Sequence, residues 1–488
     1  MLSREALATI LMVVLSVWMP RRVVAWCRRA ERALAHVATR RGLAVMLVGA
    51  FSVGGSAAVS LLGQMPQPSI HDEFSYLLAA DTFTSGRLTN PTHPMWVHFE
   101  SMHIIHQPTY TSKYPPGQGL ALAVGQVLSG RPIVGVWLSM GLACAAVTWM
   151  LQAWLPPWWA LLGGLLMVVR MGIFGYWSQT YWGGAVAAIG GALVWGAVRR
   201  VVSRPRVREA LLLGLGLAIL ANSRPFEGLL VSLPAAGVLL VWTVRRTGPD
   251  VRVALRSVWV PVLIVLLLTA GMMGGYNLRV TGDPLRLPYL VHEEAYYTAP
   301  LFLWQRPRPE PPYRHQVLRD FHREQAQAYM HQRSLAGFVA VKATRFRELW
   351  QFYLGPALTL PLIFLPWVLK DRWMRLVLLT SGVVAVGLLA EVANFLHYSA
   401  PMTGLLFALV LQSMRHLRVW RWRGRPIGRF VIWGIVVICV VLAPQNRGKL
   451  KGWNLLRAGI LARLEESGDR HLVIVRYWTS HHPQSEWV

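Results

Sequence analysis

The residues of this sequence best suited to chemistry are two adjacent carboxylates, Asp72 and Glu73, in the segment HDEFSYLLAADTFTSGRLTNP. They directly follow the apolar run 42–63 and belong to a polar stretch, His71 to Gly119, between two long apolar runs. A carboxylate pair just outside a bilayer can carry out acid/base chemistry without burial in hydrocarbon. We therefore take this pair as the candidate reaction centre and expect the rest of the chain to mount it on a membrane.

Basic side chains that could bind an anion beside the pair come from separate stretches. Lys113 lies in SKYPPG, and Arg224 lies in NSRPFEG, where polar residues interrupt apolar sequence. Arg279, in YNLRVTGDPLRLPY, and Arg170 are the next candidates after these two. Each arginine could instead extend its charge from a helix end to the membrane interface, so both interpretations stay open.

Polar motifs at the outer ends of several apolar runs supply candidates for substrate contact. They are His71, Tyr76, Tyr114, Tyr181, Trp182, Glu227, His397 and Tyr398. Their aromatic rings could stack on a substrate or belong to the aromatic belt at the membrane interface, and the histidines could be structural. As a set, these motifs favour one site at the outer membrane interface.

Composition identifies a membrane protein. Of 488 residues, 54% are hydrophobic and 15% are charged, which is too apolar for a soluble domain. The net charge of +27 comes from arginines in short segments between apolar runs, the pattern of cytoplasmic loops that set topology. Because no basic face with interleaved aromatics occurs outside these loops, nucleic acid is excluded as a partner.

The apolar runs predict an all-α polytopic bundle of about 11 transmembrane helices, or 12 if residues 5–19 also span. The runs are 42–63, 132–153, 157–173, 183–198, 209–221, 228–243, 257–276, 351–369, 373–391, 398–413 and 427–443. Arginines in 20–41 place that segment in the cytoplasm, so the first outer loop, 64–116, faces the exoplasmic side.

Three parts follow from this topology. Residues 1–41 form an N-terminal anchor or interfacial helix with a basic cytoplasmic segment, 42–443 the transmembrane domain, and 444–488 an exoplasmic tail. In the long outer segment, 277–350, a proline-rich piece (304–313) precedes an amphipathic helix over 316–333 and a second helix to 347, which could form a lid or a brace. The tail is expected to hold a helix over 454–466 and a strand over 472–478.

No metal site is assigned from the sequence. Histidines crowd the first outer loop, but adjacent residues such as His71 and Asp72 cannot easily face one ion, and no HExxH motif is present. Cys27, Cys144 and Cys439 show no CxxC spacing and no position suited to a disulfide in an outer loop. A divalent metal as cofactor is left open.

The first outer loop resembles that of the C-type glycosyltransferase (GT-C) superfamily, nearest to protein O-mannosyltransferases and lipid A aminoarabinose transferases. The resemblance is carried by Asp72-Glu73, with Tyr76 soon after, and by Lys113-Tyr114-Pro115-Pro116 closing the loop. It implies that the acidic pair supplies the catalytic carboxylate and that Lys113 helps to hold donor phosphate. Two departures weaken the phosphate assignment: Tyr114 separates Lys113 from the prolines, and Ser75 stands where the aminoarabinose transferases have a basic residue.

The resemblance implies an enzyme that moves a sugar from a polyprenyl phosphate, such as undecaprenyl phosphate, to a lipid, glycan or protein acceptor. Asp72 would act as the base of an inverting transfer, and the departing phosphate would need cations rather than a general acid. The expected location is the bacterial inner membrane, with the site on the periplasmic side and membrane lipids as partners. The alternatives are another lipid-phosphate-handling transferase or ligase, and a transporter, which fits less well because no internal repeat or mid-helix acid cluster is evident.

Overall fold

The computed structural model describes residues 3–18, 21–245, 250–446, 452–476 and 478. Among these residues the only sheet has two short antiparallel strands, β1 (Ile104–Ile105) and β2 (Thr111–Ser112), with Ile104 opposite Ser112. All other regular elements are helices, which confirms the predicted all-α class.

Seven described helical runs are long and apolar enough to cross a membrane, so the chain is an integral membrane protein. They are α3 (Arg41–Leu62), α6 (Pro132–Trp154), α9 (Ala185–Ser203), α11 (Pro225–Val244), the run Val251–Thr281 made by α12 (Val251–Ala254), η3 (Leu255–Trp259) and α13 (Val260–Thr281), α19 (Arg372–Ala390), and Ile427–Gln445 starting with α21 (Ile427–Leu442). A bent pair, α16 (Leu335–Tyr353) with Gly355–Val368, would be an eighth.

The predicted count of 11 to 12 spans is not confirmed, because several apolar runs form helices shorter than a bilayer requires. These are α7 (Pro157–Met167), α10 (Val207–Ala221), α20 (Thr403–Arg418) and, at the N-terminus, α1 (Arg4–Ser16). The run predicted over 351–369 is broken: α16 and the following α17 (Gly355–Thr359), η4 (Leu360–Phe364) and α18 (Leu365–Val368) meet at 85°. Gly355 adopts φ +58 at this bend, a left-handed conformation that glycine accepts without strain.

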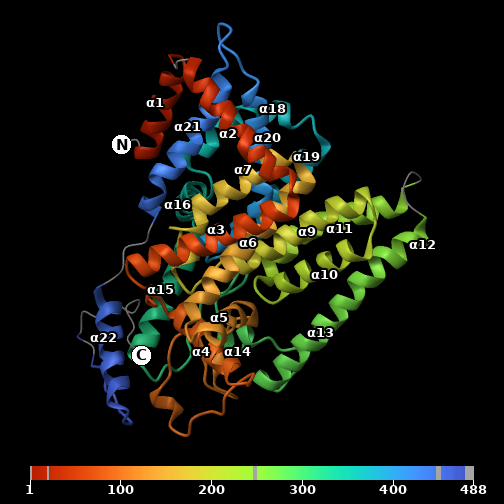
Figure 1. Cartoon of the computed structure of the whole chain (residues 1–488). Coiled ribbons are helices and arrows are strands. Elements are labelled where there is room, and N and C mark those ends of the chain that lie inside the picture. The colour runs from red at the N-terminus through yellow and green to blue at the C-terminus, as the bar shows by residue number, and fades with distance from the viewer. Residues whose placement is uncertain (1–2, 19–20, 246–249, 447–451, 477, 479–488) are drawn as a thin grey trace.

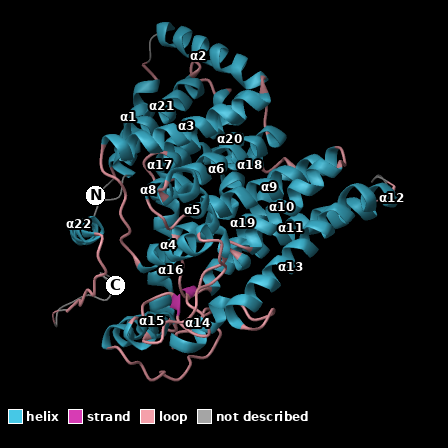
Figure 2. Ribbon diagram, turned by 60° about the horizontal axis from the view of Figure 1, so that its bottom comes forward, coloured by secondary structure: helices cyan, strands magenta, loops and turns pink. Residues whose placement is uncertain are grey.

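The polar elements gather at one end of the bundle. Figure 1 shows α4 (His71–Thr84), α5 (Pro116–Ser129) and α14 (Pro288–Tyr296) at the lower end, whereas α2 (Arg21–Thr39) and α18 lie at the upper end. In Figure 2 the two strands lie beside α14. The amphipathic helix predicted over 316–333 is confirmed as α15 (Gln316–Gln332), and the second polar helix is the first part of α16.

Close packing at a glycine pair holds this end to the spanning helices. A Cβ on Gly135 of α6 would lie 2.1 Å from the carbonyl oxygen of Ala121, and one on Gly125 of α5 would lie 2.0 Å from the nitrogen of Gly135. Only glycine lets two helix backbones approach so closely. Helix α5, which follows Lys113 and Tyr114, is therefore fixed against α6.

The tail differs in part from expectation. The predicted helix is confirmed as α22 (Gly452–Ser467), and the Asn454 side chain donates to the carbonyl of Gln67, 3.2 Å away, just before α4. The predicted strand over 472–478 is wrong for residues 472–476, which form none, and residue 477 lies outside the described residues. A lone strand needs a partner, and in the part of the chain described here β1 and β2 pair with each other.

The two ends of the bundle should face opposite sides of the membrane. Ser85 and Ser203 are exposed at opposite ends of the fold, and each hydroxyl bonds a carbonyl of its own helix. The natural cysteines are buried, so an introduced cysteine should react first. We expect an impermeant maleimide to label Ser85→Cys in intact cells and Ser203→Cys only after permeabilisation. The reverse pattern, or labelling of both from one side, would overturn this sidedness.

Candidate functional site

Asp72 lies in the first turn of α4 and keeps some access to solvent. Its Oδ1 accepts a short hydrogen bond from the hydroxyl of Tyr114, and its Oδ2 lies 3.9 Å from His103 Nε2. Its side chain is 21% exposed, whereas that of His103 is only 7% exposed. Burial, with Lys113 and the neighbouring histidines, lowers the pKa of His103 well below its usual value, so this imidazole is neutral. A carboxylate anchored at one oxygen and partly open to solvent can accept a proton.

Ser75 brings the partner residues of Asp72 into place. Its hydroxyl donates to the carbonyl of His103 at 2.7 Å and lies 2.7 Å from Ser112 Oγ, which holds the open end of the β1–β2 hairpin against α4. The amide of Lys113 donates to the same His103 carbonyl at 3.3 Å. Ser75, which departs from the basic residue of the similar families, thus positions Lys113 and Tyr114 next to Asp72.

Glu73 points away from Asp72 and binds backbone. Its Oε2 accepts from the amide of Ser69 at 2.7 Å, and its Oε1 accepts from the amide of Tyr181 at 2.8 Å. The residue is 1% exposed. Both carboxylate oxygens of Glu73, a predicted catalytic residue, thus bond backbone amides, which caps α4 and ties it to the segment before α9.

Tyr181 belongs to this connection. Its hydroxyl donates to the carbonyl of Pro66 at 3.2 Å, and its own carbonyl accepts from Gln118 Nε2 at 2.9 Å. These bonds tie the hydroxyl and the main-chain carbonyl of Tyr181 to neighbouring segments, and the residue is 8% exposed.

Lys113 is enclosed by tyrosines. It is 2% exposed, its Nζ donates to the hydroxyl of Tyr297 at 2.9 Å, and Nζ lies 4.8 Å from the ring centroid of Tyr289 and 4.6 Å from that of Tyr297. Burial lowers the pKa of Lys113 to about 8, an effect opposed by Glu293 and Asp72. The aromatic faces and these carboxylates stabilise the cation inside the protein.

The sequence analysis missed this enclosure. Tyr289, Glu293 and Tyr297 come from α14 and its C-cap, about 180 positions after Lys113. The one sequence feature that could have indicated these contacts is the high content of tyrosine and glutamate in PYLVHEEAYY. The prediction of a lid or brace over 277–350 did not draw on it.

Arg224 occupies the second half of the site. Its Cζ lies 4.2 Å from the ring centroid of Tyr398, and its Nη1 lies 3.8 Å from Glu227 Oε1. Its side chain is 18% exposed, so this cation is more accessible than Lys113. Arg224 precedes α11, and Tyr398 lies in η5 (Leu396–Met402), so two distant segments form this half.

Tyr76 joins the two halves. Its ring stacks on that of Tyr114 with centroids 4.6 Å apart. Burial raises the pKa of Tyr76, and both Arg224 and Asp72 act on it electrostatically. Arg224 and Asp72 also act electrostatically on the pKa of Tyr398. The acid and the arginine therefore lie near the same two tyrosines, Tyr76 and Tyr398.

His397 lies between Trp182 and Tyr398, the ring that contacts Arg224. The ring centroids of His397 and Trp182 are 4.6 Å apart, and His397 Nδ1 lies 3.3 Å from the hydroxyl of Tyr176 in α8 (Tyr176–Gln179). Burial and Arg224 lower the pKa of His397 well below its usual value. Its buried Nε2 has no hydrogen-bond partner within the described chain and could bond a ligand.

Of the remaining predicted residues, one joins the site and two do not. The ring of His71 lies 6.1 Å from that of His103, so His71 is part of the cluster. Arg170, in the short π-helix η2 (Val168–Gly172), bonds Glu5 at 3.3 Å and the carbonyl of Phe352 at 3.1 Å, which braces α1 against α16. Arg279 is exposed near the end of α13, and no contact links it to the site among the described residues.

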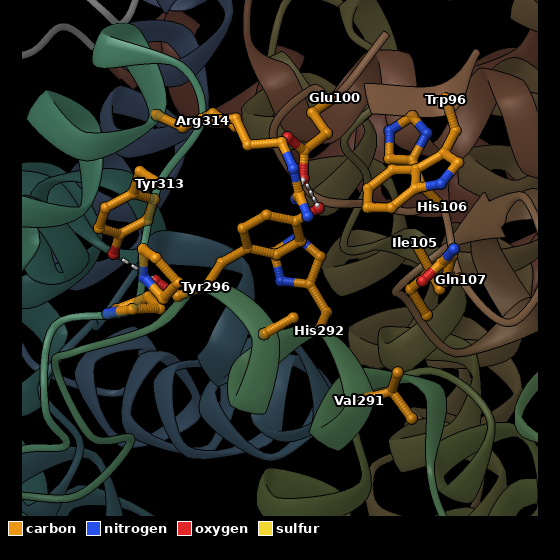
Figure 3. A pocket seen from close by; sticks show the side chains of 14 residues that line it. Trp96, Glu100, Ile105, His106, Gln107, Val291, His292, Tyr296, Tyr313 and Arg314 are labelled. Atoms are coloured by element: carbon orange, nitrogen blue, oxygen red, sulfur yellow. Dashed lines mark hydrogen bonds and ion pairs between the residues drawn. The ribbon is translucent and has the colours of Figure 1, made fainter. Parts of the chain in front are cut away.

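Two cavities lie near the site, and Asp72 borders neither of them. The larger cavity, about 200 Å³, lies between the first outer loop and the outer segment; Figure 3 shows Trp96, Glu100, His292 and Arg314 among its lining residues. A smaller one of about 110 Å³ includes Glu293 and Arg308. Within the described ranges, no three His, Cys, Asp or Glu side chains are grouped to hold a metal ion.

Comparisons with known proteins gave only distant structural neighbours. No family model and no curated protein matches the chain. The oligosaccharyltransferase AglB of Archaeoglobus fulgidus, solved with an inhibitory peptide and a dolichol-phosphate, matches at 11% identity and a TM-score of 0.41, covering 86% of this chain and 57% of its own. The apo form of the Archaeoglobus fulgidus oligosaccharyltransferase matches at 10% identity and a TM-score of 0.42, covering 88% and 59%.

Both neighbours are oligosaccharyltransferases. This chain spans less than two thirds of their length. At such identities and TM-scores the likeness by itself establishes neither a shared fold nor a shared activity.

The buried carboxyl of Glu73 should make stability depend on pH. Burial raises its pKa from 4.5 to about 7 against the opposing hydrogen bonds of Ser69 and Tyr181. The folded state therefore binds this proton more tightly than the unfolded state, and stability falls as pH rises from about 4.5 to about 7, by on the order of 3 kcal/mol. We expect Glu73→Gln to reduce this slope in thermal unfolding of the detergent-solubilised protein.

The control is Glu465→Gln in the exposed end of α22, which should leave the slope unchanged. Part of the slope should persist in Glu73→Gln, because burial also raises the pKa of Glu293 to about 7. Equal slopes in Glu73→Gln and wild type would contradict the assignment.

Proposed function

We propose that this protein is a membrane glycosyltransferase of the GT-C type that transfers a sugar from a polyprenyl phosphate to a lipid, glycan or protein acceptor. The observation that carries the proposal is the gathering of an acid and two cations on a group of tyrosines at one end of a bundle of apolar helices. Asp72 and Lys113 both contact Tyr114, which stacks on Tyr76, and Arg224 lies over Tyr398. Arginine-rich loops at the other end support a site on the periplasmic side of a bacterial inner membrane, with undecaprenyl phosphate as the carrier.

Asp72 acts as the general base. An acceptor hydroxyl attacks the anomeric carbon of the sugar, its proton passes to Asp72, and the bond from that carbon to the phosphate oxygen breaks. Attack opposite the departing phosphate inverts the anomeric configuration. The bond from Tyr114 holds one carboxylate oxygen in place and leaves Oδ2 for the proton.

The cations stabilise the leaving group. Polyprenyl phosphate departs as an anion, so it needs positive charge and N–H donors where its charge develops. Arg224 is the better placed to touch phosphate, because its guanidinium is partly exposed. Lys113 supplies charge from beneath, within electrostatic reach of Asp72.

The neutral side chains around Arg224 bind the sugar. His397 offers its unpartnered Nε2, and Trp182 and Tyr398 offer aromatic rings beside it. Helix α14 covers the site from the outside through Tyr289 and Tyr297, consistent with a lid role for the outer segment.

Asp72→Asn tests the base. Asparagine can still accept from Tyr114 but cannot take the proton, so we expect transfer from a radiolabelled polyprenyl-phosphate sugar pool in membranes to fall about a hundredfold or more. The matched control is Asp81→Asn in the same helix, whose carboxylate bonds Gln126 and lies outside the site. Transfer like wild type by correctly folded Asp72→Asn would remove the assignment.

Arg224 and Arg279 give a matched pair for phosphate binding, because both arginines stand at helix ends on the same side of the bundle. We expect Arg224→Ala to lower kcat/KM for the donor about a hundredfold, as for the loss of one donor to a developing anion, and Arg279→Ala to change it less than about twofold.

Arg224→Ala alone leaves the buried Glu227 without its cation, which could unfold the protein. Arg224→Ala combined with Glu227→Gln removes the charge without that penalty. An equal fall in kcat/KM in the Arg279 and Arg224 variants would contradict a specific phosphate contact by Arg224. It would show instead that any positive charge at this surface attracts the donor.

A further inference from the structure

The larger cavity is a built site that the proposed reaction centre does not use. Three parts of the chain line it: the first outer loop with Trp96, Glu100 and His106, helix α14 with His292 and Tyr296, and residues 311–318 with Tyr313 and Arg314. In Figure 3 Trp96 and His106 lie on one side of the space and Tyr313 on the other. The cavity lies among outer loops rather than between spanning helices, so it faces the exoplasmic medium.

Two buried polar side chains in its wall have unused hydrogen-bonding atoms. His292 is 1% exposed, and neither of its ring nitrogens has a hydrogen-bond partner within the described chain. The side chain of Glu100 is 3% exposed, and its Oε1 accepts from Tyr296 at 2.9 Å and from Arg314 at 3.2 Å. Its Oε2 has no hydrogen-bond partner within the described chain and lies 3.8 Å from His315 Nε2, beyond hydrogen-bond distance. Buried polar atoms are rarely left unbonded, so these atoms point to a ligand.

The charge of the cavity selects an uncharged ligand. Arg314 and Glu100 form an ion pair, so their charges offset each other. Burial lowers the pKa of His106 to about 4 and that of His292 well below its usual value, so both imidazoles are neutral. A phosphate would meet the Glu100 carboxylate, and an acyl chain would leave the polar atoms unbonded.

We propose that this cavity binds a neutral pyranose unit of the acceptor. Sugar hydroxyls donate and accept at once, which matches the Glu100 carboxylate, the Arg314 guanidinium and the neutral His292. The rings of Trp96, Tyr296 and Tyr313 offer apolar surface for the C–H face of a sugar. This inference rests on the proposed function, because only a glycosyl transfer gives the bound saccharide a reaction partner.

The position fits an acceptor subsite beside the reaction centre. The ring of His292 lies 6.0 Å from that of His103, whose Nε2 lies 3.9 Å from Asp72. Two imidazoles thus separate the cavity from the base. A glycan seated there would leave its next unit, rather than the bound one, free to reach Asp72.

Saturation-transfer NMR on the full chain in nanodiscs tests the cavity, with the methyl pyranosides of glucose, mannose and N-acetylglucosamine as probes. We expect at least one to bind, and Trp96→Ala and Glu100→Gln each to weaken its binding about tenfold or more, as for residues that dominate a small interface. The matched controls are Trp304→Ala and Glu310→Gln, which are exposed residues of the outer segment outside the cavity.

Binding that is absent from wild type, or unchanged in both cavity variants, would overturn the inference. Asp72→Asn should bind the glycoside like wild type, so loss of transfer and loss of this binding are separate results. In the transfer assay the best-binding glycoside should not compete with the donor. Competition with the donor would overturn the assignment to the acceptor.

Discussion

The arrangement of the site depends on how the first turn of α4 is tied to its neighbours. Glu73 bonds the amides of Ser69 and Tyr181 on one side, and Ser75 bonds His103 and Ser112 on the other. Because these residues alternate with Asp72 and Phe74 along the turn, the bonds fix the direction in which Asp72 points. The same bonds deliver Lys113 and Tyr114, so the acid and its partners are positioned by one set of contacts.

Aromatic rings allow two cations to lie inside this end of the protein. A lysine or arginine removed from water loses hydration, and an opposite charge or the face of a ring must replace it. Lys113 has the tyrosines of α14, and Arg224 has Tyr398 and Glu227. These rings also exclude water, which strengthens any electrostatic interaction with a bound anion. The tyrosines of the outer segment thus stabilise a buried cation in addition to packing against their neighbours.

The lengths and bends of the helices show why the number of membrane-spanning helices does not equal the number of apolar runs in the sequence. The runs that form α7, α10 and α20 are apolar but shorter than a bilayer requires, and a run of similar composition is bent by 85° at Gly355. Polar groups inside the bundle, such as Arg170 with Glu5, are satisfied by one another and by freed carbonyls. Length, bends and buried pairs are properties of the packed bundle.

The sequence by itself determined the helical membrane class, the helices at 316–332 and 452–467, and the association of Asp72 with a polar loop after a spanning helix. It did so because composition, periodicity and charge distribution are local properties. Only the tertiary structure decided which carboxylate of the pair stays accessible, because two adjacent acids of nearly the same chemistry are distinguished by the direction in which each side chain points. It also decided that Arg224 joins the site while Arg170 and Arg279 do not, and that α14 contributes Tyr289, Glu293 and Tyr297. Those contacts join residues more than a hundred positions apart, a distance over which no local pattern carries information.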